Sequence, residues 1–166
     1  MDPGVVLRGF RLDDAAMAVE LSSDPYVPLT GSLPANADEA QARAWVERQQ
    51  GRLAEGIGWS FAIADVSSDR ALGSAGLWFT DSPGVFTVGY GVVPSARGRG
   101  VATEALALLV EFAGNLPAAR RLLAHVEPWN SASIRVAERV GFRREGRTRH
   151  EIGGGLREVL VLVRER

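Results

Sequence analysis

The chain of 166 residues contains no cysteine and no lysine, and its only histidines are His125 and His150. Without cysteine there is no disulfide, no thiolate metal site and no cysteine nucleophile. Two histidines that show no ligand spacing with carboxylates do not make a zinc site, so we expect no metal. The lack of lysine also excludes a Walker phosphate loop, which requires a Gly-Lys-Ser/Thr sequence.

Long apolar runs are also absent. The longest, Ala105–Val110, is far shorter than the ~20 residues of a membrane-spanning helix. Acids at Asp2, Asp13 and Asp14, with no apolar segment, argue against an N-terminal signal peptide. We therefore expect a cytoplasmic protein with no membrane partner. A chain of this length that is 46% hydrophobic can build one sizeable core, which predicts a single domain over residues 1–166.

The charges are divided unevenly along the chain. Up to Val93 there are 6 Arg against 12 acids, and from Pro94 there are 13 Arg against 8 acids, so the two parts carry −6 and +5. A basic second part suits an anionic cofactor, and an acidic first part suits a cationic amine. The near-neutral total and the lack of a basic run interleaved with aromatics disfavour nucleic acid. An RNA-binding module that uses the arginines of 97–99 and 143–149 is a weaker alternative.

Apolar periodicity and turn residues predict an alternation of strands and helices. Strands are predicted at residues 5–10, 59–64, 71–80, 85–93 and 121–127, with a closing hairpin from 142–149 and 157–164. Helices are predicted at about 13–21, 38–53, 100–114 and 131–140. Ser22–Ala37 contains three prolines and is predicted to be a loop.

The lengths of the connections predict how these strands pair. The short turns between residues 59 and 93 favour an antiparallel meander. The strand–helix–strand unit from Val85 to Glu127 favours a right-handed parallel crossover. We therefore expect an α/β fold with a mixed, mostly antiparallel sheet, one parallel strand pair and about four flanking helices.

Residues 87–103, TVGYGVVPSARGRGVAT, are the most informative segment. Pro94 has no amide hydrogen to give to a sheet, so the strand should end there. Gly98 and Gly100 lack a Cβ, so the backbone amides around them can approach a ligand closely. The free N–H groups and the dipole at the start of the next helix favour a phosphate or pyrophosphate. An ordinary solvated strand-to-helix turn is the alternative.

Two motifs together resemble a known family. Arg97-x-x-Gly100-x-Ala102 is similar to the Gln/Arg-x-x-Gly-x-Gly/Ala pyrophosphate loop of the GCN5-related N-acetyltransferase (GNAT) superfamily. The segment from Asn130 to Phe142 resembles the Asn-x-x-Ser-to-Gly-Phe segment of its RimJ/RimL-like branch, which acetylates the N-termini of ribosomal proteins. The resemblance extends over nearly the whole chain and implies a single-domain GNAT fold.

This resemblance implies that acetyl-CoA is the co-substrate, and it assigns the residues that contact it. Backbone groups at the end of the strand before Pro94 would lie beside the pantetheine arm and the thioester, where one amide polarises the acetyl carbonyl. Backbone amides of the Arg/Gly loop and of the first helical turn would hold the pyrophosphate. The implied cofactor-binding residues are Val92, Val93, Arg97, Gly98, Arg99, Gly100, Val101, Ala102, Thr103 and Asn130.

The resemblance also suggests how protons move. Ser133 occupies the position of the branch's serine, which implies that its hydroxyl protonates the leaving thiolate, and Tyr90 is the second candidate. A helix-capping role is the alternative for Ser133 and for Asn130. The first candidate for the base that takes a proton from the acceptor is Glu127. Other candidates are His125, His150, Glu151, Asp81 and Asp24.

The implied reaction is direct transfer of an acetyl group from acetyl-CoA to a primary amine, either a protein N-terminus or a small amine. The lack of cysteine excludes an acetyl-cysteine intermediate. An acyl-CoA-binding or sensing protein with little turnover is the alternative, and a homodimer is left open. Ser22–Ala37 is expected to form a lid. Trp59, Trp78, Phe79 and Phe86 are expected either to line an acceptor cleft or to pack in the core.

Overall fold

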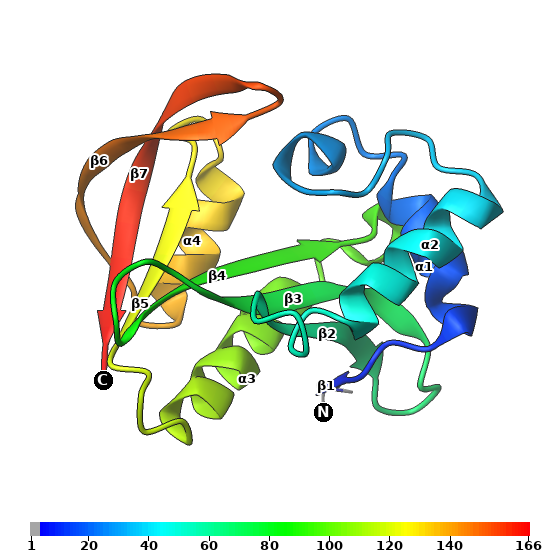
Figure 1. The fold of residues 1–166 in the computed structure, drawn as a ribbon, viewed down its shortest axis with the longest axis horizontal. Helices are drawn as coiled ribbons and strands as arrows, with labels where there is room; N and C mark the ends of the chain where they lie inside the picture. Colours follow the sequence, from blue (N-terminus) through cyan, green and yellow to red (C-terminus); the bar gives the residue numbers. More distant parts are fainter. Residues whose placement is uncertain (1–3) are drawn as a thin grey trace.

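A seven-stranded sheet forms the centre of the computed structural model, which describes residues 4–166. The strand order is β1-β2-β3-β4-β5-β7-β6 (Figure 1). The strands are β1 (Val5–Arg8), β2 (Gly58–Asp65), β3 (Ala71–Phe79), β4 (Val85–Val92), β5 (Arg121–Val126), β6 (Arg143–Ile152) and β7 (Gly155–Glu165). The helices are α1 (Ala15–Leu21), α2 (Glu39–Gln50), α3 (Val101–Gly114) and α4 (Ser131–Arg139), with short 3-10 helices η1 (Leu12–Asp14), η2 (Val27–Thr30) and η3 (Pro94–Ala96).

The sheet opens between its two parallel strands. All other neighbouring strands pair antiparallel, and β4 pairs with β5 only from Val85↔Arg121 to Thr87↔Leu123. β4 continues to Val92 and keeps its pairing with β3 along the opposite edge. The two strands therefore splay apart beyond Thr87, as Figure 1 shows. The predicted mixed sheet, with one parallel pair and four α-helices within residues 4–166, is confirmed.

The two faces of the sheet carry different helices. On one face, Phe61 of β2 packs edge-on against Phe112 of α3, with 5.1 Å between the ring centres, and α4 packs beside α3. On the other face, the neighbouring Ser60 donates a hydrogen bond to Gln49 of α2 at 2.8 Å. Side chains alternate between the faces along a strand, so the strand register assigns every residue of β2, β3 and β4 to one face or the other.

Residue pattern and capping explain where α2 and α3 form. In α3 the buried residues Val101, Ala105, Leu109 and their neighbours recur at helical spacing and face the sheet. Asp38 caps α2, because its carboxylate accepts the Gln41 backbone N–H at 2.8 Å while the Gln41 side chain accepts the Asp38 N–H at 3.0 Å.

Several boundaries differ from the predictions. The first strand ends at Arg8, and α2 ends at Gln50, where Gly51 follows. The closing hairpin is longer than predicted, because Gly153 and Gly154, both at positive φ, form a tight turn directly between β6 and β7.

Three of the four aromatic side chains considered for a cleft belong to the core face. Trp59, Phe79 and Phe86 form one cluster with Phe112 of α3, with ring centres 5.2–6.1 Å apart along its contacts. Phe86 is buried in the core and the half-buried Trp59 packs against it, which confirms the core alternative for these two, whereas Phe79 is 46% exposed at the edge of the cluster. Trp78 points to the opposite face of the sheet.

Candidate active site

The first turn of α3 offers a row of unpaired backbone donors. Gly98 and Gly100 have φ values of +80° and +76°, which only glycine adopts readily, and this conformation turns the chain from η3 into α3. A Cβ on either glycine would meet nothing within 4 Å. No backbone N–H from Gly98 to Thr103 finds an acceptor within residues 4–166. These donors, at the positive end of a 14-residue helix, suit a phosphate group.

The edge of β4 that faces β5 is open next to this turn. Val93 N–H donates to Leu72 O on β3 at 2.9 Å, and Val93 O accepts the Ala96 N–H at 3.0 Å. Alternation along the strand therefore directs the backbone groups of Val92, and of Tyr90 before it, into the gap between β4 and β5. Val92 and Val93 were both expected to offer backbone groups to the pantetheine arm and the thioester. Both backbone groups of Val93 are engaged within the protein, so only the Val92 N–H of this pair is an open donor.

The side chain of Arg97 is held by the protein instead of extending toward the α3 turn. Its Nε donates to Val92 O at 3.0 Å, and its Nη2 lies 2.7 Å from Asp24 Oδ2. Burial raises the pKa of Asp24, but hydrogen bonds from the Tyr26 backbone, Arg97 and the Val27 backbone lower it by more. Asp24 is therefore a paired carboxylate that anchors its loop, and Arg97 is partly neutralised.

Ser133 and Tyr90, the two candidate proton donors, lie in contact. Tyr90 reaches from β4 across the gap to the first turn of α4, where its hydroxyl is 2.9 Å from Ser133 Oγ and donates to Ser133 O at 3.2 Å. Asn130 Oδ1 accepts the Ser133 N–H at 3.2 Å, so Asn130 caps α4 as its alternative reading predicted. Burial raises the pKa of Tyr90, although its contact with Ser133 opposes this, so the phenol stays protonated at neutral pH.

Glu127 is buried and surrounded by donors. Arg157 Nη1 of β7 lies 3.4 Å from both carboxylate oxygens, and the donor side chains of Tyr26 and Trp129 lie near them. Burial raises the pKa of Glu127, but these three partners lower it by more. A carboxylate with a lowered pKa is a weak base, so these contacts favour a structural role. Tyr26, Trp129 and Arg157 carry no local motif, and the sequence alone did not identify them.

The remaining base candidates lie in different places. His125 lies in β5, two residues before Glu127, and therefore on the same face of the sheet. Its ring stacks on that of His150 of β6, with the ring centres 4.9 Å apart and the ring planes 14° apart. Burial, followed by the charge of His150, lowers the pKa of His125, which keeps it neutral and able to accept a proton. Asp81 lies in the turn before β4, at the opposite end of that strand from Val92, and Glu151 is exposed on β6.

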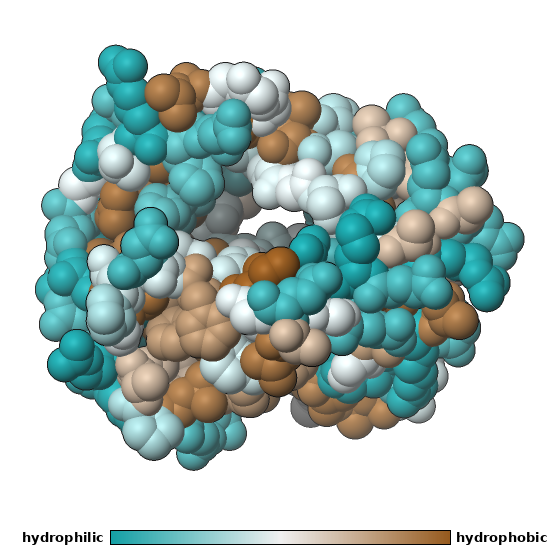
Figure 2. Space-filling model, viewed as in Figure 1, coloured by the Kyte–Doolittle hydropathy of each residue, from teal (hydrophilic) through white to brown (hydrophobic). Residues whose placement is uncertain are grey.

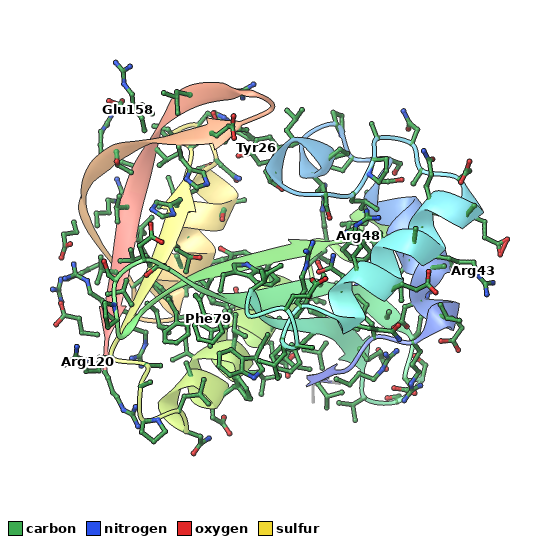
Figure 3. The ribbon with its side chains drawn as sticks, in the orientation of Figure 1. Tyr26, Arg43, Arg48, Phe79, Arg120 and Glu158 are labelled. Carbon is green, nitrogen blue, oxygen red and sulfur yellow. The ribbon has the colours of Figure 1, made fainter. Side chains whose placement is uncertain are left out.

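The loop predicted as a lid spans the opening. It includes η2, and Tyr26 packs edge-on against Trp129 with 5.0 Å between ring centres. Leu29 O accepts the Gly153 N–H at 3.0 Å, which joins the loop to the β6–β7 hairpin. Figure 3 shows Tyr26 beside this hairpin, and Figure 2 shows an opening through the molecule beneath the loop. We call this opening, which lies beside the gap between β4 and β5, the channel.

Four of the six arginines considered for RNA are engaged by carboxylates, and only Arg99 and Arg149 among them make no ion pair within residues 4–166. Arg143, Arg144 and Arg147 are each paired with a carboxylate, at 3.3 Å, 3.0 Å and 2.7 Å, and Arg97 is paired with Asp24. Within residues 4–166 no three histidine or acidic side chains group to hold a metal ion. In the same part of the chain no helix has the length and apolarity that crossing a membrane requires.

Comparison with known proteins identifies the family. Residues 5–143 match the family model described as an acetyltransferase (GNAT) domain. The chain belongs to the GNAT family. This GNAT protein is 29% identical over 143 residues to the uncharacterized N-acetyltransferase p20 of Bacillus licheniformis, covering 86% of this chain and 80% of p20. It is an acetyl-CoA-dependent acetyltransferase, as the motifs predicted.

Solved structures agree with this fold. RimJ of Mycobacterium smegmatis, determined with a CoA disulfide, superposes with a TM-score of 0.82 at 26% identity, covering 98% of this chain and 83% of RimJ. RimL, a ribosomal L7/L12 α-N-protein acetyltransferase determined with coenzyme A, superposes with a TM-score of 0.80 at 17% identity, covering 99% and 95%. The GNAT fold, with RimJ and RimL among its structural neighbours, is thereby confirmed.

Proposed function

We propose that this GNAT protein transfers the acetyl group of acetyl-CoA directly to a primary amine in a ternary complex, and that the acceptor is a protein N-terminus or a small amine. The observation that carries the proposal is the row of unpaired N–H groups from Gly98 to Thr103 beside the open edge of β4. The name of RimL, an α-N-protein acetyltransferase, supports a protein N-terminus.

The residues at the gap suit a diphosphate carrier with an extended arm. Backbone donors of the α3 turn would hold the pyrophosphate, and Arg99, exposed beside them, would add a positive charge. The Val92 N–H would bind a carbonyl of the arm or of the acetyl group. Asn130, at the start of α4, would border the same arm. Bound acetyl-CoA supplies the reactive thioester.

One hydroxyl of the Ser133–Tyr90 pair would provide the proton for the departing sulfur. Ser133 lies in the first turn of α4 with its Oγ 2.9 Å from the Tyr90 hydroxyl, so its position is set before the substrates bind. An ordinary thiol has a pKa near 8.5, so one hydroxyl donor suffices for the thiolate to leave. Ser133 is the proposed donor, and Tyr90 orients it.

The proton of the acceptor needs another route. Glu127 remains a candidate base from the sequence, but its three donors hold it as a paired anion. We propose His125, which is neutral and lies on the same face of β5, or a water chain in the channel, as the route for this proton.

A screen of acceptors tests the function. Thiol release from acetyl-CoA is measured with peptides of varied first residue, a polyamine and simple alkylamines, and acetylated products are verified by mass. We expect turnover with at least one amine class. Tight acetyl-CoA binding with no turnover on any amine would refute the proposal and favour an acyl-CoA-binding protein.

A further inference from the structure

Trp78 lies flat on three glycines from three neighbouring strands. A Cβ built on Gly76 would stand 2.0 Å from Trp78 Cζ2, and one on Gly58 would stand 3.0 Å from Cε3. A Cβ on Gly89 of β4 would lie 3.4 Å from Nε1. The indole therefore covers positions where any other residue would place a side chain, and it forms an aromatic floor on the face of the sheet that carries α1 and α2.

This floor borders the gap between β4 and β5. Gly89 immediately precedes Tyr90, which reaches through to Ser133 on the other face. Gly89 is three residues from Val92, about 10 Å along the strand. Leu21 of α1 lies 3.7 Å from a Cβ built on Gly91 and bounds the floor on that side. A molecule that rests on the floor can therefore extend its amine into the channel where the thioester would lie.

The indole N–H is a donor without a partner. Within residues 4–166 it makes no hydrogen bond. Every buried side-chain nitrogen and oxygen in that range has a partner, so this unpaired N–H is not a buried one. Trp78 is only half-buried, so its Nε1 is reached by solvent, beside Gly89. Tryptophan can only donate at this atom, so the N–H suits an acceptor oxygen of a bound molecule.

The carboxylates near the gap are not available to a polycation. Asp24 is paired with Arg97, and Glu127 with Arg157. The side chain of Glu127 is only 6% exposed, so its carboxylate is shielded from solvent although Arg157 is not. An acceptor made only of ammonium groups can lie against the indole ring, but it would find two neutralised acids and an N–H donor that it cannot use.

We propose that Trp78 is the specificity-determining residue of the acceptor site. The first residue of a peptide lies on its indole ring, and the indole N–H donates to a carbonyl oxygen of that peptide. The site thus selects a peptide N-terminus over a polyamine. The inference rests on the proposed acetyl transfer and deepens it by naming the acceptor class.

Two variants and a matched control test this role. Trp78→Phe keeps a flat ring and removes the N–H, and Gly89→Ala keeps the indole and places a methyl group 3.4 Å from Nε1. Each should lower kcat/KM for a peptide acceptor by about tenfold and leave the Kd for acetyl-CoA unchanged. Trp59→Phe makes the same chemical change on the opposite face and should not alter kcat/KM.

The outcomes separate this inference from the proposed function. Peptide turnover that is unchanged in Trp78→Phe and in Gly89→Ala overturns the role of the indole, as does a wild-type preference for the polyamine. Wild-type protein that binds acetyl-CoA and acetylates no amine overturns acetyl transfer itself. Thermal melts identify a variant that fails to fold, and the other variant then decides the result.

Discussion

Replacing Gly100 with aspartate tests whether the first turn of α3 binds the pyrophosphate. Gly100 has a left-handed conformation (φ +76°, ψ 10°), and a Cβ there would meet no atom within 4 Å. Aspartate and asparagine have the same shape and tolerate this conformation better than other side chains. The pair Gly100→Asp and Gly100→Asn therefore differs in charge, while the backbone strain is shared.

The size of the effect follows from the distance between charges. A carboxylate at about 5 Å from one phosphate charge is repelled by about 1–3 kcal/mol for an effective dielectric constant between 80 and 20. This predicts a Kd for CoA that is about 5- to 150-fold weaker in Gly100→Asp than in Gly100→Asn. Isothermal titration calorimetry measures both, and the ratio should shrink as salt is added, because screening weakens the repulsion.

The same substitution should change stability in the opposite direction. A carboxylate at the start of α3 interacts favourably with the helix dipole, by about 0.3–1 kcal/mol. Gly100→Asp should therefore melt no lower than Gly100→Asn although it binds CoA more weakly. Equal Kd values for the two variants would show that the pyrophosphate does not contact this turn.

Two further predictions concern the gap. Ser133→Ala should lower kcat by about 10²-fold with little change in the Kd for CoA. Tyr90→Phe should lower kcat by a smaller factor. A larger loss of kcat in Tyr90→Phe than in Ser133→Ala, measured in steady-state assays, would make Tyr90 the donor. Glu127→Gln should lower the free energy of unfolding by about 1–3 kcal/mol at neutral pH. The pKa of Glu127 is lowered in the folded protein, so the stability that its carboxylate contributes is complete above the ordinary carboxyl pKa and is lost as pH falls through the lowered value. Urea melts of both proteins, at neutral pH and at a pH below the lowered pKa, measure this loss.

The elements of the fold followed from local patterns. Pro94 ends β4 because it lacks an amide hydrogen, and the apolar spacing of 101–113 marks the buried face of α3. The Arg/Gly loop was predictable because its function depends on backbone conformation, which the glycines reveal. The order of short and long connections then predicted one parallel pair in an otherwise antiparallel sheet.

The contacts that organise the gap were not predictable from local patterns. Asp24 and Arg97 pair because η2 folds back over the end of β4, and Glu127 meets Tyr26 for the same reason. Each of these residues, viewed alone, is typical of a solvated surface. The role of Trp78 was equally hidden, since only the register of β2, β3 and β4 places three glycines beneath its ring.

The pairing of both nearby carboxylates affects how the rate should depend on the acceptor's own pKa. Of the two proposed routes for the proton, the water chain requires that the attacking amine lose its proton largely before it reacts. At pH 7 about one in seven α-amino groups is neutral, compared with about one in 2,500 lysine-like amines. The kcat/KM for a peptide N-terminus should therefore level off near pH 8, and that for an alkylamine should keep rising tenfold per pH unit to about pH 10. A plateau at the same pH for both acceptors would instead show that a protein group, such as His125, takes the proton.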